Sequence, residues 1–252
     1  MRNPLAIAAL FGLGVFSTSH TLAGGSETSA AVENEIKTLR RTNPESYLDI
    51  QRIWLTRRPI PVCWEPNTSK FKEERRWVEQ AIKAVVENPS AVRFTGYGET
   101  ADRWPTCTDK SLGIRVAAAT TRPRSEVGQQ WSPDPYSKQR VEKPTFMTLD
   151  FTLGGAYSGY CAKDKKHCLE VISVHEFMHA IGFLHEHLRE DAPKGCKKMF
   201  GHERDDSGVE PVRFSADYDA DSIMTYCTSI YRKPVKLSTQ DIEAIDYFYR
   251  YQ

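Results

Sequence analysis

Short stretches in which apolar and polar residues alternate predict β-strands at three places in the first two thirds of the chain. Ile60–Trp64 forms one stretch, and residues 113–119 form a second that is apolar enough to be buried. Residues 145–151 alternate most regularly. This alternation places three apolar side chains on one face of a strand, namely Met147, Leu149 and Phe151.

Apolar residues spaced three and four positions apart predict helices between and after these strands. Residues 71–85 have this spacing, and Pro89 ends the helix. Residues 171–181 predict a second helix with apolar side chains available for packing. Near the end of the chain, the motif Ser238-x-x-Asp241 predicts the capped start of a further helix. The pattern as a whole predicts helices packed on a sheet.

The N-terminal residues have the order of a secretory signal peptide. Arg2 is followed by an apolar run and then by small residues that end at Ala23. The following residues are rich in Ser, Thr, Glu and Asn and show little apolar periodicity, which is typical of a leader, either a short pro-segment or a loose arm. The predicted organisation is a signal peptide at residues 1–23, a leader at 24–52 and one folded domain at 53–252.

The charge of the chain is balanced, with 34 Lys and Arg against 33 Asp and Glu and a formal net charge of +1. Removal of the predicted signal peptide removes one arginine and no acid, which leaves a net charge of 0 (+1 − 1). Such a chain has no general attraction to nucleic acid or anionic lipid. No stretch approaches the roughly 20 apolar residues of a membrane span. We expect a secreted or periplasmic protein, and we expect the basic cluster at 163–166 to be a solvated turn.

The strongest chemical signal is the stretch His-Glu-x-x-His-x-x-Gly-x-x-His at 175–185. On an α-helix, His175 and His179 lie about 40° apart around the axis and one turn apart along it, so both can bind one metal ion. Glu176 is rotated away from them and can contact a metal-bound water. If the helix continued, His185 would point away, so we predict that Gly182 ends the helix with a positive φ.

Three imidazoles and one open position are the ligand set of a catalytic zinc ion. The shorter His-Glu-x-x-His pattern also occurs by chance or on solvated helix faces. The added glycine and third histidine have separate geometric roles, which makes coincidence improbable. The sequence therefore predicts one zinc ion held by His175, His179 and His185.

A second motif, at residues 221–226, is centred on Met224, 39 residues after His185. The extended zinc motif followed by a turn with a methionine resembles the metzincin metalloproteases. Within that clan the chain is most similar to the astacin family. The similarity rests on Gly182-Phe183-Leu184-His185-Glu186 with Arg189, and on Ser222-Ile223-Met224-x-Tyr226.

The astacin resemblance implies that Met224 forms an apolar floor beneath the histidines. It also implies that Tyr226 binds zinc at rest and stabilises the oxyanion during turnover. On its own, a Met-x-Tyr motif is more typical of core packing. The chain departs from the family at Thr225, where astacins usually have histidine, and in a shorter interval between His185 and Met224. Substrate preference is therefore not carried over.

The resemblance further implies an α+β fold. We expect a twisted, mostly parallel sheet with an antiparallel edge strand, two long helices in the upper lobe, and a small irregular lower lobe that ends in a helix. Residues 145–151 would be the antiparallel edge strand that borders the cleft and pairs with an extended peptide. An ordinary sheet strand is the alternative. We expect a monomer.

Six cysteines follow the signal peptide, and in an exported chain this even number predicts three disulfides. The residues alone leave all of the roughly fifteen possible pairings open. The resemblance favours Cys161 with Cys168, which would close a short loop before the zinc helix as an astacin disulfide does. Two further pairs are expected, Cys196 with Cys227 and Cys63 with Cys107. Metal binding by cysteine is the competing interpretation, but close Cys-x-x-Cys spacing is missing.

The predicted activity is that of a secreted zinc endopeptidase with Glu176 as the general base and Tyr226 as the oxyanion donor. Proteins or peptides are the expected substrates. A secreted zinc-containing binding module without turnover is one alternative, and the presence of Glu176 argues against it. An amidase or peptidoglycan hydrolase with the same zinc chemistry is the other, which only the astacin resemblance disfavours.

Several other polar residues have weaker signals. We predict that His187 and His202 are surface histidines, because neither has a ligand partner at a useful spacing. In the leader, Asp49 is a weak candidate for a latch on the zinc. In astacins the counterpart of Glu186 anchors the mature N-terminus, and it can do so here only if processing creates a suitable end. A cluster of acids is predicted to be a solvated loop rather than a calcium site, namely Glu203, Asp205 and Asp206.

Overall fold

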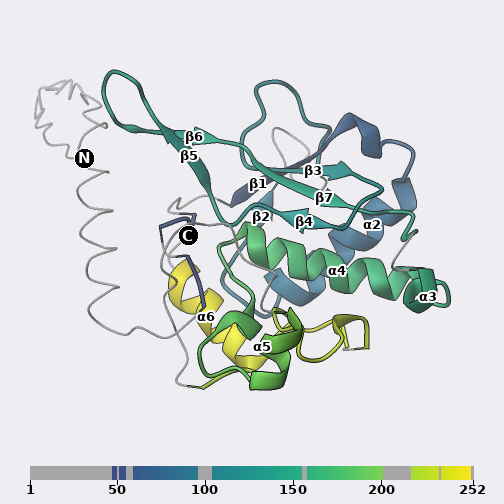
Figure 1. Ribbon diagram of the computed structural model, residues 1–252. Coiled ribbons are helices and arrows are strands. Elements are labelled where there is room, and N and C mark those ends of the chain that lie inside the picture. Colours follow the sequence, from purple (N-terminus) through teal and green to yellow (C-terminus); the bar gives the residue numbers. More distant parts are fainter. Residues whose placement is uncertain are drawn as a thin grey trace, which may run out of the picture.

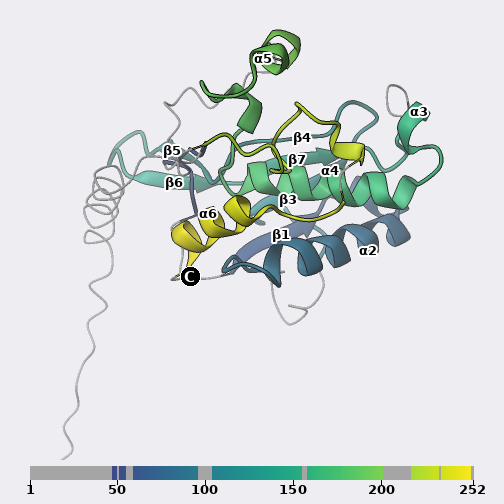
Figure 2. The same ribbon diagram turned by 90° about the horizontal axis from the view of Figure 1, so that it is seen from below.

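The computed structural model describes residues 47–49, 51–54, 59–95, 104–154, 158–200, 217–232 and 234–250. A five-stranded sheet forms one layer of the molecule, and two long helices cover one of its faces (Figures 1 and 2). The strand order is β2-β1-β3-β7-β4. The strands are β1 (Ile60–Trp64), β2 (Phe94–Thr95), β3 (Ile114–Ala118), β4 (Arg124–Ser125) and β7 (Thr145–Leu149).

Four of the five strands are parallel, and β4 alone is antiparallel to its neighbour β7. The prediction that residues 145–151 form the antiparallel edge is wrong, because β7 lies inside the sheet and pairs in parallel with β3. Its alternation has another cause: Met147 packs against the helices, while Phe146 on the opposite face is 50% exposed. The antiparallel edge strand is β4, which has two residues, too few to show a pattern.

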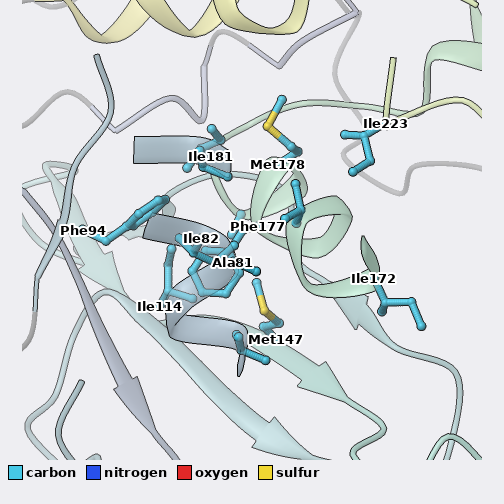
Figure 3. Close-up of a cluster of buried hydrophobic side chains, with 14 of the residues drawn as sticks. Ala81, Ile82, Phe94, Ile114, Met147, Ile172, Phe177, Met178, Ile181 and Ile223 are labelled. Atoms are coloured by element: carbon cyan, nitrogen blue, oxygen red, sulfur yellow. The ribbon is translucent and has the colours of Figure 1, made fainter. Parts of the chain in front are cut away.

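The core lies between the sheet and the helices α2 (Lys72–Ala81) and α4 (Lys165–Ala180). Helix α2 continues as a π-helical segment, Ile82–Glu87, so the helix predicted at 71–85 is confirmed. Figure 3 shows that side chains from both helices and from the sheet meet in one cluster. The cluster includes Ile82, Ile114, Met147, Ile172 and Phe177. The mostly parallel α+β fold is as predicted.

Helix α4 begins six residues before the predicted start, at Lys165 rather than at residue 171. The carboxylate of Asp164 caps this end by accepting a hydrogen bond from the backbone N–H of His167 at 3.0 Å. Lys166 pairs with Glu170 one turn further along. The prediction of a solvated turn at 163–166 is thus wrong for residues 165 and 166, which belong to α4. This first helical turn is polar, and periodicity of apolar residues cannot detect it.

The remaining elements are short and lie around this core. They are α3 (Ser158–Cys161), α5 (Lys194–Phe200), α6 (Thr239–Tyr249), and a hairpin of β5 (Gln130–Pro133) and β6 (Arg140–Lys143). The hairpin projects away from the sheet, and α5 and α6 lie on the far side of α4 (Figure 1). The capping box of Ser238 and Asp241 at the start of α6 is confirmed. None of the helices in the described ranges is long and apolar enough to cross a membrane.

All six cysteines are paired in disulfides, and the three predicted pairs are confirmed. Cys161–Cys168 joins α3 to the start of α4. Cys196–Cys227 joins α5 to the residue that follows Tyr226. Cys63–Cys107 fastens β1 to the stretch before β3. Each bond thus connects an element of the core, or the segment that carries Tyr226, to a neighbouring segment.

Candidate metal centre

The three histidines of the extended motif converge on one point. His175 and His179 lie on α4, and His185 follows the turn at its end. The Nε2 atom of His185 lies 3.3 Å from Nε2 of His175 and 3.1 Å from Nε2 of His179. All three side chains are buried, and one nitrogen from each lies within 4.8 Å of the others. The structure therefore brings together the three residues predicted to bind the metal.

Backbone carbonyls orient two of these rings. Nδ1 of His175 lies 2.9 Å from the carbonyl oxygen of Ile223, and Nδ1 of His179 lies 2.8 Å from that of Phe183. A carbonyl oxygen only accepts, so each Nδ1 carries the proton and each Nε2 presents a lone pair to the centre. Burial, followed by the neighbouring His179 and His185, holds the pKa of His175 well below its usual value. The neutral imidazole is the form that binds metals.

The spacing of these atoms fits zinc. With Zn–N bonds of about 2.0–2.1 Å, neighbouring ligands of a tetrahedral ion lie about 3.3–3.4 Å apart. The two Nε2–Nε2 separations, 3.3 Å and 3.1 Å, are close to this distance between ligands. The hydroxyl of Tyr226 lies 3.1 Å from Nε2 of His185 and 3.3 Å from Nε2 of His175, so it lies at a further corner of the same group. The donor set and its spacing both suit one zinc ion.

The other predicted site residues lie around this group. Glu176 is buried on α4 directly after His175. Met224 is buried in the turn that carries Tyr226, and its carbonyl oxygen accepts a hydrogen bond from the backbone N–H of Glu186 at 3.0 Å. The turn with the methionine is therefore bound directly to the residue that follows the third histidine.

Gly182 reverses the chain at the end of α4 and brings His185 back toward the helix. Its φ is +103°, in the region that glycine adopts without a Cβ clash, which confirms the prediction. The N–H of Gly182 bonds to the carbonyl of His179 at 2.8 Å, and the N–H of Phe183 bonds to that of Met178 at 3.0 Å. These two bonds form a compact helix end.

The segment at residues 47–54, here called the N-terminal strap, pairs with this turn, although residue 50 is not among the described residues. The backbone N–H of Asp49 bonds to the carbonyl of Gly182, and the N–H of Leu184 bonds to the carbonyl of Tyr47, both at 2.9 Å. Leu48 lies between these bonds and is fully buried. The part of the predicted leader that the structure describes thus packs against the zinc motif.

Two further side chains bind the carbonyl groups at the end of α4. The indole N–H of Trp54 donates to the carbonyl of Ala180 at 2.8 Å. The hydroxyl of Tyr249, from α6, donates to the carbonyl of Ile181 at 2.7 Å and accepts from the backbone N–H of Trp54 at 3.3 Å. Burial raises the pKa of Tyr249. Residues from both ends of the described chain therefore cap the helix that carries the histidines.

His187 is fully buried, so the prediction of a surface histidine is wrong. Its ring stacks on the ring of Tyr226, with centroids 4.9 Å apart and planes 21° apart, and lies 5.0 Å from the ring of His185. The reversal at Gly182 turns the short helix Glu186–Leu188 inward, which local spacing cannot reveal. His202 and the predicted acidic loop at 203–206 lie outside the described residues.

The acids singled out in the sequence have partners of their own. Glu186 accepts a hydrogen bond from the backbone N–H of Asp219 at 3.0 Å and pairs with the buried Arg189 at 3.2 Å. Burial raises the pKa of Glu186 to about 7, and the bond from Asp219 opposes this rise. The carboxylate of Asp49 contacts its own segment, through the N–H of Gln51 at 3.0 Å and the guanidinium of Arg52 at 3.4 Å.

Comparisons with known proteins give only distant resemblances. No family model and no curated protein matches the chain. Among solved structures, it is similar to high choriolytic enzyme 1, a hatching-enzyme zinc protease from the medaka fish Oryzias latipes. The identity is 19% and the TM-score 0.47, over 82% of this chain and 99% of that one.

Two structures of myroilysin are also similar, each at 15% identity. One has a TM-score of 0.45 over 80% of this chain and 97% of that one. The other has a TM-score of 0.38 over 79% of this chain and 86% of that one. Resemblances this distant do not establish a shared activity, so the functional conclusion rests on the residues of the site.

Proposed function

We propose that this chain is a secreted zinc-dependent endopeptidase of the astacin type, in which His175, His179 and His185 hold one zinc ion. The observation that carries the proposal is the convergence of three Nε2 atoms and the Tyr226 hydroxyl at the separations of zinc ligands. When bound, zinc supplies Lewis-acid polarisation of a peptide carbonyl and lowers the pKa of a coordinated water.

The residues of the chain supply the proton transfers. Glu176 accepts a proton from the attacking water and passes it to the leaving amine, as a buried carboxylate beside the metal ligands can do. Tyr226 donates a hydrogen bond to the oxygen on which negative charge develops. Its position in contact with two of the histidines supports this role.

The edge strand β4 is the proposed binding site for the peptide backbone. It is the last strand of the sheet, and one of its sides pairs with β7. Within the part of the chain that the structure describes, its other side pairs with no strand, so an extended peptide can add to it by backbone hydrogen bonds. We therefore assign peptide binding, which the sequence predicted for residues 145–151, to Arg124–Ser125.

We further propose that the protein is exported, that residues 1–23 are removed as a signal peptide, and that the mature protein is a monomer. Three disulfides support an oxidising compartment. The contacts of the N-terminal strap favour a folded domain that already includes residues 47–49 rather than one that begins at residue 53. Processing that leaves the strap in place is consistent with this structure.

The test uses the disulfide-bonded protein without its signal peptide, incubated with a mixed peptide library and separately with peptidoglycan. We expect peptide cleavage that a chelator abolishes, that added zinc restores, and that Glu176→Ala eliminates. Glu170→Ala is the matched control, because Glu170 lies on the same helix and pairs with a lysine.

Three outcomes would contradict the proposal. Zinc binding without cleavage of either substrate would identify a binding module. Cleavage of peptidoglycan alone would identify a peptidoglycan hydrolase. Peptide cleavage that persists with chelator, or in Glu176→Ala, would place the reaction elsewhere in the protein.

A further inference from the structure

The start of helix α6 is joined to the turn that carries Met224 and Tyr226 through the buried carboxylate of Asp241. One carboxylate oxygen accepts from the hydroxyl of Ser222 at 2.8 Å. The other accepts from the backbone N–H of Ser238 at 3.1 Å and from that of Ile223 at 3.2 Å. Asp241 therefore caps its own helix and also holds a turn that lies 18 and 19 residues earlier in the sequence.

From Asp241, hydrogen bonds continue without interruption to a predicted zinc ligand. The Ser222 hydroxyl that donates to Asp241 accepts from the backbone N–H of Met224 at 3.0 Å. That N–H belongs to the same peptide group as the carbonyl of Ile223, which accepts from Nδ1 of His175 at 2.9 Å. The path therefore runs from Asp241 through Ser222 and one peptide group to His175.

This path controls the rotation of one peptide group. Its carbonyl must point at His175 if that ring is to keep its proton on Nδ1 and its lone pair on Nε2. Its N–H points the other way and is held by Ser222. Hydrogen bonds in such a chain polarise and strengthen one another. In a buried chain, the loss of one group leaves its partner without a hydrogen bond, which is costly. All the groups in the path are buried.

We propose that Asp241 and Ser222 are positioning residues of the metal centre, which orient His175 through the peptide group between Ile223 and Met224. The inference deepens the proposed function, because it requires His175 to bind zinc. A plain helix cap is the competing explanation for Asp241. A cap affects the stability of the fold, whereas a positioning residue also changes the affinity of the site for zinc.

The experiment measures zinc affinity of the disulfide-bonded, signal-free protein by competition with a chromophoric chelator, after its zinc has been removed. We expect Ser222→Ala and Asp241→Asn each to weaken zinc binding about tenfold, the lower end of the range for groups that support a metal ligand. Because Asp241 acts partly through Ser222, the double variant is expected to lose less affinity than the sum of the two single losses.

Asp164→Asn is the matched control. It makes the same chemical change at another helix cap, at the end of α4 that is distant from the histidines, and it is expected to leave zinc affinity unchanged. Ser222→Ala retains the capping carboxylate, so it supplies the test if Asp241→Asn does not fold. Unchanged zinc affinity in Ser222→Ala, or fully additive losses in the double variant, would overturn the inference.

The two proposals can fail separately. If the unmodified protein binds zinc but cleaves no peptide, the proposed function fails, while the positioning role is still measured by the zinc affinities. If peptide cleavage is present but Ser222→Ala binds zinc as the unmodified protein does, the positioning role fails alone.

Discussion

The two halves of the metal centre are built in different ways. His175, Glu176 and His179 lie on a single helix, and the spacing of the backbone alone places the two rings one turn apart. His185 and Tyr226 lie in segments without regular structure at their own positions. Their placement depends on bonds between residues far apart in the sequence, such as the 68 residues between Ile181 and Tyr249.

The difference shows where the site can be weakened without replacing a ligand. The helical half depends on local geometry that many surrounding sequences can provide. The half formed by His185 and Tyr226 depends on the N-terminal strap, on α6 and on Gly182. Substitutions in these supports are therefore expected to affect the site even though none of them contacts the metal.

The largest effect is expected for the N-terminal strap. Leu48→Ala removes a fully buried side chain beside the turn at Gly182, and the cavity should lower the free energy of unfolding by about 2–5 kcal/mol. Denaturant unfolding of the disulfide-bonded protein measures this change. Leu112→Ala, at a side chain that is 39% exposed, is the control. Equal stability of the two variants would show that the strap is a dispensable leader.

The next largest effect is expected at Tyr226, whose hydroxyl lies beside two of the histidines. Tyr226→Phe retains the ring that stacks on His187 but removes the hydroxyl near the histidines. We expect kcat for peptide cleavage to fall about 100-fold, equivalent to about 2.7 kcal/mol, with KM little changed. Steady-state kinetics on a single peptide measures both constants. Tyr136→Phe is the control on an exposed tyrosine, and a kcat unchanged in Tyr226→Phe would remove that residue from the mechanism.

A smaller effect is expected at the contact between α6 and the end of α4. Tyr249→Phe removes the hydroxyl that donates to the Ile181 carbonyl and accepts from the Trp54 N–H. Loss of these partners in a buried place should cost about 1–3 kcal/mol of unfolding free energy. Thermal unfolding compared with Tyr247→Phe, two residues away on the same helix and 39% exposed, isolates the buried hydroxyl. A matching Tm for the two variants would contradict this explanation.

The smallest effect is expected at the turn itself. Gly182→Ala places a Cβ at a φ of +103°, which should cost about 1–2 kcal/mol of unfolding free energy. The added Cβ would lie 3.4 Å from the Ile53 side chain, so the strain comes mainly from the backbone. Gly195→Ala in α5 meets no atom within 4 Å and should be neutral or stabilising. Denaturant midpoints that shift in the same direction for both variants would contradict the proposed role of the turn.

Sequence reasoning succeeded where the determinants are local. The spacing of His175 and His179, the positive φ of Gly182 and the capping box at Ser238 depend on a few neighbouring residues. The strand β1 was located for the same reason. For the disulfides, the family resemblance favours one pair, Cys161 with Cys168, since spacing alone does not distinguish the possible pairings.

Sequence reasoning failed where tertiary contacts decide the structure. The edge strand β4 is too short to have a period, and the buried apolar residues of the strap, Leu48, Ile53 and Trp54, have no regular spacing. His187 is buried because the chain reverses five residues earlier, at Gly182, and returns toward the helix. The capping box predicted one role for Asp241, but its bond to Ser222 depends on how two distant segments meet.

The capping of α4 from both ends of the described chain has a consequence for the order in which the protein matures. Asp49 and Trp54 emerge early during synthesis, but Tyr249 emerges nearly 200 residues after Trp54, at a separation of 195. A growing polypeptide therefore cannot complete the support for the turn that places His185 until Tyr249 has been synthesised.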